Sequence, residues 1–199
     1  IQTSAADSYF ATSTRFLYHN SKPVLAAASN TPTGSKVPQS GQEIFIFTVT
    51  NSGTRDMRIQ SLSVTVAATG LLADATTVAD RNAVNTYDLY DGTQKIATNS
   101  TVANQLSLQT TSAVVRFGTS NAISNYFDNF IVSAGASKTL TLKADTSNIR
   151  TTVAAGSTVY LNARITGSTG YNTGNAWSTG NFAYFYTPVF GTENAVEYR

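Results

Sequence analysis

The stretch Glu43–Val66, "EIFIFTVTNSGTRDMRIQSLSVTV", is typical of two β-strands joined by a turn. β-branched and aromatic residues dominate both halves, and Asn51–Gly53 supplies turn residues between them. In the first half, Ile44 and Ile46 fall on one face of the expected strand. Apolar residues on both faces predict a central strand, or one whose second face is covered. The other face carries Phe45, Phe47 and Val49.

The second half changes phase partway along. Met57 and Ile59 share one parity, whereas Leu62 and Val64 have the opposite one. A pattern with a period of two residues changes phase only through an inserted residue. The sequence therefore predicts a β-bulge near Gln60–Ser61.

Outward from this stretch, strand patterns continue. Thr86–Thr98 predicts a hairpin that turns at Asp91-Gly92, and "NQLSLQ" and "AVVRFG" are expected to be further strands. Residues 71–85 fit a short helix or a long loop, and no window shows a convincing helical period. The chain is predicted to be all-β. Two later strands alternate cleanly, with an inward set of Leu140, Leu142, Ala144, Val159, Leu161, Ala163 and Ile165.

Composition narrows the function classes. The 199 residues suit one large β domain, only 12% are charged, and the net charge of +2 predicts neither a nucleic-acid groove nor a polybasic membrane patch. The absence of Cys excludes disulfides and thiol nucleophiles, and a single His makes a His-based zinc site improbable. No apolar run reaches the ~20 residues of a membrane-spanning helix. Because the chain begins at Ile1, we expect a processed, exported chain at the cell surface.

Residues 23–167 resemble a repeat found in surface proteins of candidate-phyla-radiation bacteria. The resemblance rests on the run from "PVLAAASNTPTGSKVPQSGQEIFIFTVT" to "SLSVTV", on "YDLYDGTQKIA" and on "FIVSAGASKTLTLKADTS". It implies an immunoglobulin-like antiparallel β-sandwich that serves as a spacer or wall module. Those relatives carry the module in tandem, whereas this chain has one copy with extensions at both ends, which points toward assembly.

The first extension, residues 1–22, is predicted to be an extended arm. Phe16 and Tyr18 alternate with Arg15 and Leu17. Such an arm either adds a strand to a neighbouring subunit or folds back as an edge strand of its own sandwich. The expected subunit contacts are Thr14, Phe16, Leu17, Tyr18 and His19.

The second extension, residues 168–199, begins with a loop-like stretch rich in Gly, Asn, Ser and Thr and continues with "FAYFYTPVF". It is expected to pack on the sandwich or on a neighbouring subunit, because its aromatic residues need a cover. The same aromatics form the alternative glycan-binding face. The candidates are Trp177, Phe182, Tyr184 and Tyr186.

Catalysis has little support in the residue inventory. His19 lies in a polar hinge without a nucleophile elbow, and Asp88 and Asp91 are more simply explained as hairpin residues. No cofactor is expected, although β-sandwich loops can bind Ca²⁺ through Asp and carbonyl oxygens. Asn99 begins the N-x-S/T sequon Asn99–Thr101 and is a candidate glycosylation site.

The sequence thus predicts a non-enzymatic subunit of an extracellular homopolymer, a pilus-like filament or an S-layer-like lattice, assembled by strand exchange and sandwich contacts. The alternative is a surface adhesin or carbohydrate-binding module. Neither nucleic acid nor membrane insertion is expected, and glycans are possible partners.

Overall fold

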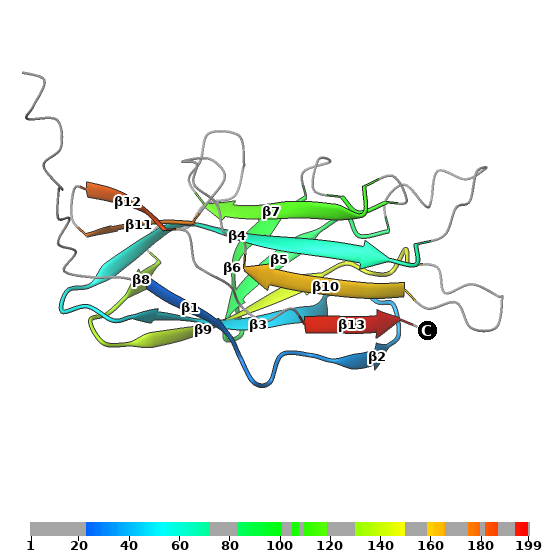
Figure 1. The fold of residues 1–199 in the computed structure, drawn as a ribbon, viewed down its shortest axis with the longest axis horizontal. Coiled ribbons are helices and arrows are strands. Elements are labelled where there is room, and N and C mark those ends of the chain that lie inside the picture. The colour runs from blue at the N-terminus through cyan, green and yellow to red at the C-terminus, as the bar shows by residue number, and fades with distance from the viewer. Residues whose placement is uncertain are drawn as a thin grey trace, which may run out of the picture.

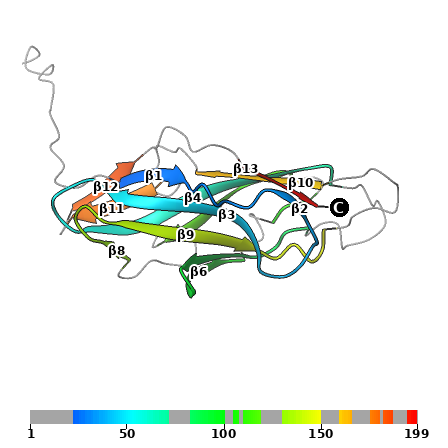
Figure 2. The ribbon, with the colours of Figure 1, turned by 90° about the horizontal axis from the view of Figure 1, so that it is seen from below.

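The computed structural model describes residues 23–71, 83–100, 105–107, 110–118, 130–149, 159–165, 175–179, 182–186 and 194–198. Every regular element in these ranges is a β-strand (Figure 1). The all-β prediction is therefore confirmed. The strands form two sheets, and most of them run roughly along the long axis of the molecule (Figure 2).

The first sheet has five antiparallel strands in the order β1-β3-β9-β5-β6. Its two edges in the described chain are β1 and β6. The bounds are β1 (Pro23–Ala27), β3 (Gln42–Asn51), β9 (Ser137–Ala144), β5 (Tyr87–Asp91) and β6 (Gln94–Asn99).

The second sheet has eight strands, and its long central strand, β4, pairs along both edges. One edge pairs with β10 and β11 and continues in the order β12-β11-β4-β10-β13-β2, while β7 and β8 pair with the other edge. Its pairings are antiparallel except for β13 with β2, which are parallel. The bounds are β4 (Met57–Thr69), β10 (Val159–Ile165), β11 (Asn175–Thr179), β12 (Phe182–Tyr186), β13 (Asn194–Tyr198), β2 (Gly34–Lys36), β7 (Ser112–Gly118) and β8 (Ile131–Val132).

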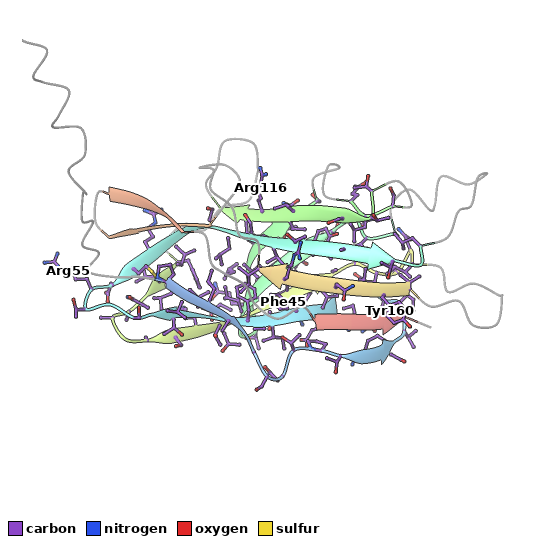
Figure 3. The ribbon with its side chains drawn as sticks, in the orientation of Figure 1. Phe45, Arg55, Arg116 and Tyr160 are labelled. Atoms are coloured by element: carbon purple, nitrogen blue, oxygen red, sulfur yellow. The ribbon has the colours of Figure 1, made fainter. Side chains whose placement is uncertain are left out.

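The hydrophobic core lies between the two sheets, which makes the fold a β-sandwich. The first sheet contributes Phe45 and Phe47, whose rings stack at 5.3 Å, together with the leucines of β9. The second contributes the apolar residues of β4, β7 and β10. Phe45 lies in the middle of the molecule, where the side chains are densest (Figure 3). The predicted inward sets on β9 and β10 are confirmed, because each member is at most 3% exposed.

The predicted bulge is confirmed at Gln60. Ala176 of β11 pairs with Ser61, but the next residue, Trp177, pairs with Ile59, so Gln60 has no partner on β11. The inserted residue lets the apolar side chains on both sides of it face the core. Those side chains are Met57, Ile59, Leu62, Val64, Val66 and Ala68.

A second bulge explains the two-faced pattern of β3. Glu43 pairs with Lys143 of β9, whereas Phe45 pairs with Leu142, so Ile44 is the inserted residue. Ile44 is 1% exposed and belongs to the core. On the opposite face, Ile46 is also buried, and the hydroxyl of Thr31 accepts a hydrogen bond from its N–H and donates one to its carbonyl oxygen.

The remaining strand predictions are confirmed in part. The hairpin of β5 and β6 turns after Asp91 as expected, with Gly92 at a φ of 61°. "NQLSLQ" forms only an isolated bridge between Leu106 and Val84 within the described residues. Part of the stretch expected to be loop-like, Asn175–Thr179, is instead strand β11. The predicted helix or loop at residues 71–85 falls largely outside the described residues.

Candidate functional site

The predicted donor arm lies outside the described residues. Residues 1–22 include all five of its expected contacts: Thr14, Phe16, Leu17, Tyr18 and His19. Its participation in a subunit interface therefore stays a prediction. The part of this region that the structure does describe is the strand that follows the arm, β1.

β1 is an edge strand with a free side among the described residues. It pairs in antiparallel register with β3, from Pro23 opposite Asn51 to Ala27 opposite Phe47. The next residue, Ala28, donates its N–H to the carbonyl of Ile46 at 2.9 Å. Because backbone groups point to alternate sides along a strand, even-numbered residues bond to β3 and odd-numbered residues point to the free edge.

The free edge of β1 carries none of the usual barriers to strand addition except its first residue, Pro23. Its sequence is Pro-Val-Leu-Ala-Ala, with no charged side chain, and Val24 is 43% exposed. Native proteins commonly protect edges with lysine, proline, bulges or short strands. The three-residue β2 is short and carries Lys36.

The other edge of the first sheet, β6, is protected. It carries Lys95, its register with β5 is interrupted after Leu89, and it contacts β7 of the second sheet. The side-chain amide of Asn99 spans this contact by donating to the carbonyl of Arg116 at 2.7 Å. β1 is therefore the less protected edge of the first sheet.

Ion pairs on the first sheet join neighbouring strands. Lys95 of β6 lies 2.9 Å from Asp88 of β5, and Lys143 of β9 lies 3.1 Å from Glu43 of β3. Lys138 of β9 pairs with Asp91 of β5. The hydrogen bond from Lys95 to Asp88 raises the pKa of that lysine, a shift that desolvation partly opposes.

These lysines also contact aromatic rings. The Nζ of Lys138 lies 5.0 Å from the centre of the Phe130 ring, and that of Lys143 lies 4.9 Å from the centre of the Tyr90 ring. Both distances are in the range of cation–π contacts. The charged groups thus link adjacent strands and rings in pairs. Lys143 is the register partner of both Glu43 and Asp88, so the pairs Glu43–Lys143 and Asp88–Lys95 lie in one row across the sheet.

Hydroxyl groups add further links across the first sheet. The side chains of Thr50 on β3 and Ser137 on β9 are hydrogen-bonded at 2.6 Å. Thr98 on β6 donates to the carboxylate of Asp88 at 2.6 Å, so this carboxylate receives bonds from both a hydroxyl and an ammonium. Asp88 and Asp91, the hairpin residues named in the sequence analysis, each form an ion pair: Asp88 with Lys95 of the same hairpin and Asp91 with Lys138 of β9.

The candidate glycosylation site is buried. Asn99 has no exposed surface, and its amide nitrogen, the atom to which a glycan would attach, donates to Arg116. Attachment of a glycan would require this hydrogen bond to break and β6 to separate from β7. The folded chain therefore does not present the Asn99 amide as an acceptor.

The aromatic candidates of the C-terminal extension come together along one hairpin. β11 and β12 pair so that Trp177 lies opposite Tyr184, with Phe182 and Tyr186 two register positions to either side. These four positions share one face of the hairpin. On its other edge Trp177 lies opposite Ile59, which is 2% exposed and faces the core. The register therefore places this hairpin beside the half of β4 that contains Ile59.

One buried titratable group has no role in any ion pair. Tyr87 of β5 has no exposed surface, and its hydroxyl has no hydrogen-bond partner among the described residues. Burial raises the pKa of this phenol far above its ordinary value of 10.0 because the phenolate would be poorly solvated. The group is uncharged throughout the physiological range.

In the described ranges, no three His, Cys, Asp or Glu side chains are grouped as they would be to hold a metal ion. The Ca²⁺ site considered from the sequence stays a prediction. A search of the same ranges for a helix long and apolar enough to cross a membrane finds none.

Comparison with known proteins gives little additional information. No protein-family model matches the chain, and no curated protein matches its sequence. Among solved structures, the chain is similar to one described as "AvmM Catalyzes Macrocyclization in Alchivemycin A Biosynthesis". The identity is 12%, the match covers 90% of this chain and 88% of that one, and the TM-score is 0.31, too low to support an argument about function.

Proposed function

We propose that this protein is a non-enzymatic structural subunit of an extracellular polymer, either a pilus-like filament or an S-layer-like lattice. The sandwich supplies a rigid body, and residues 1–22 supply a strand that joins one subunit to the next. The polymer is made of copies of this chain, and no cofactor takes part.

The observation that carries this proposal is that charged side chains on the first sheet form ion pairs between adjacent strands. The pairs Asp88–Lys95, Asp91–Lys138 and Glu43–Lys143 each cross-link adjacent strands. A catalytic or binding centre would instead direct several such groups toward one point in a cleft. Pairing along a sheet suits a protein whose task is to keep its shape.

The strand order supports the proposal of an immunoglobulin-like module. Immunoglobulin domains place strands A, B, E and D in one sheet and C, F and G in the other. The orders β1-β3-β9-β5 and β4-β10-β13 follow this plan, with β2 as a short second part of strand A that pairs in parallel with the last strand. The last strand of this plan, β13, lies outside residues 23–167, the part of the chain that resembles the bacterial surface repeats.

Deletion of residues 1–22 tests the proposal. We expect the shortened protein to remain folded by circular dichroism but to stay monomeric in light scattering and negative-stain images, while the full chain polymerises. The control is deletion of residues 1–10, which leaves Thr14 to His19 in place and should preserve assembly. Normal polymers formed by the longer deletion would exclude the arm from assembly, and a full chain that stays monomeric would exclude the polymer itself.

The alternative function is that of a surface adhesin or carbohydrate-binding module. Its ligand face would be the hairpin face that collects Trp177, Tyr184, Phe182 and Tyr186. Trp177 is the register partner of Ile59, a buried residue of β4. A glycan-array signal that disappears in Trp177→Ala but persists in Tyr160→Ala, a change at an exposed position of β10, would favour the alternative.

A further inference from the structure

We propose that the free edge of β1 is the site that accepts the arm, and that its occupant is the segment Thr14–Tyr18 of a second copy of this chain. This inference rests on the proposed function and adds to it the receiving surface. β1 combines a free edge among the described residues with an uncharged sequence. The edge strand β12 is also uncharged, but β1 is the described strand that directly follows the arm.

The edge offers a defined set of hydrogen-bonding groups. With the even-numbered residues bonded to β3, the free side carries the carbonyl oxygens of Pro23, Leu25 and Ala27 and the N–H groups of Leu25 and Ala27. Proline has no N–H, so the first position contributes only an acceptor. A strand of about five residues satisfies all five groups.

The side chains of the arm match the two faces of this edge. In an antiparallel register with Phe16 opposite Leu25, Tyr18 lies opposite Pro23, and both aromatics fall on the inner face of the sheet. Leu25 on that face is 8% exposed. Leu17 then lies opposite Val24, the 43% exposed residue of the outer face. Apolar residues of the arm thus extend the core on one face and cover an exposed valine on the other.

The sequence at the junction disfavours fold-back of the arm onto its own β1. In the same register, fold-back makes a hairpin whose loop is residues 19–22 and whose closing pair is Tyr18 with Pro23. That pair lacks one hydrogen bond because Pro23 has no N–H. Lys22 precedes a proline and is therefore restricted to extended conformations, whereas four-residue hairpin loops are most often built around a helical type I turn.

The extended conformation that Pro23 favours at Lys22 would direct the arm away from its own edge. The acceptor is then the β1 edge of another molecule. Each subunit donates an arm at one place and accepts one at another, so the contact is heterologous and adds subunits in an open chain.

Engineered disulfides test the acceptor directly, because the natural chain has no cysteine. In the proposed register, positions 17 and 24 form a non-hydrogen-bonded pair with a Cα separation of about 4.5 Å, which a disulfide can bridge. Leu17→Cys and Val24→Cys are prepared as separate full-length proteins, mixed, allowed to assemble and oxidised. The matched control mixes Leu17→Cys with Thr139→Cys, which places the thiol on exposed outer surface of the central strand β9.

We expect covalent dimers of the Leu17→Cys and Val24→Cys proteins on non-reducing gels, at a yield about tenfold or more above the control, a ratio equivalent to about 1.4 kcal/mol of preference. A double variant that carries both Leu17→Cys and Val24→Cys in one chain should give a ladder of covalent oligomers. A double variant that forms only an internally bridged monomer would show that the arm folds back, and would overturn the inference. Polymers that form normally but cross-link no better than the control would also overturn it, while leaving the polymer function in place.

A substitution at the edge provides a second measurement. Val24→Lys places a charge at the edge without removing a core residue, and Thr139→Lys places the same charge on the outer face of β9. We expect assembly to be lost in the first variant and retained in the second, with both folded by circular dichroism. Equal assembly of the two variants would contradict the proposal.

Discussion

Asn51 is the residue whose replacement best tests the energetics of this fold. It is the last residue of β3 and has no exposed surface. Its side-chain nitrogen donates to the carbonyl of Arg55 at 2.7 Å and to that of Val132 at 3.0 Å, while its side-chain oxygen accepts from the N–H of Gly53 at 3.0 Å. One side chain therefore holds the β3–β4 turn and fixes β8 against it.

The cost of Asn51→Ala follows from these three bonds. The carbonyl of Val132 accepts a buried bond and would be left without this donor, at a cost of about 1–3 kcal/mol. The two bonds within the turn are partly accessible to water, so each contributes about 0.5–1 kcal/mol. The free energy of unfolding should fall by about 3 kcal/mol, near the upper end of the usual range for a single substitution.

Urea denaturation followed by fluorescence measures this change. Asn51→Asp should destabilise the protein at least as much at neutral pH, because a carboxylate would face two carbonyl oxygens. The control is Asn162→Ala, at a half-buried outer position of β10, which should change the free energy by no more than about 0.5 kcal/mol. Hydrogen exchange at the Gly53 amide should also become faster in Asn51→Ala, because its acceptor is lost.

A loss in Asn51→Ala no larger than that of the control would refute this reasoning. It would mean that water replaces all three bonds without strain, and that β8 does not depend on Asn51 for its position. Unchanged exchange at Gly53 would lead to the same conclusion for the turn.

Two further changes have defined outcomes. Tyr87→Phe removes a buried hydroxyl without a partner among the described residues and should leave stability unchanged or raise it by about 1 kcal/mol, whereas Tyr90→Phe should have little effect. Above about pH 10 the unfolded chain releases the Tyr87 proton, whereas the folded chain retains it. The free energy of unfolding of the wild type should therefore fall with pH more steeply than that of Tyr87→Phe, by up to about 1.4 kcal/mol per pH unit. Urea titrations that give the same pH dependence for both proteins would contradict this. Gly92 has a φ of 61°, which a residue with a side chain adopts at a cost, although open space surrounds the new Cβ. Gly92→Ala should therefore lower the free energy of unfolding by about 1 kcal/mol in thermal unfolding, whereas the control Thr93→Ala should change it little. Equal melting temperatures would show that the turn relaxes.

The order in which the strands pair lay beyond what the sequence could predict. β3 pairs with β9 across about ninety intervening residues, and β13 inserts between β10 and β2. An amphipathic pattern indicates that a strand has a buried face, but it does not name the neighbour. The same limit applies to β11, whose Asn-, Ser- and Thr-rich surroundings resemble a loop. It forms a strand beside the bulged half of β4, which the sequence does not indicate.

For the candidate sites, the sequence shows which residues are present, but their surroundings depend on the pairing of distant strands. The sequon at Asn99 is a local pattern, but its burial against Arg116 depends on the contact of β6 with β7. The aromatic residues of the tail were visible in the sequence, whereas their alignment with buried Ile59 depends on pairing with β4. A buried asparagine such as Asn51 gives no sequence signal beyond that of an ordinary turn residue.

Four features could be predicted from the sequence: the all-β class, the residues of β9 and β10 that face inward, the position of the hairpin turn and the change of phase in β4. These features depend on the alternation of side chains along a single strand, which is local. Three features depend on the tertiary structure: Ile44 turns into the core at a bulge, Asn51 and Asn99 are buried, and β1 has a free edge among the described residues. These outcomes depend on which distant strands come together, and that choice is made by burial of the whole core at once.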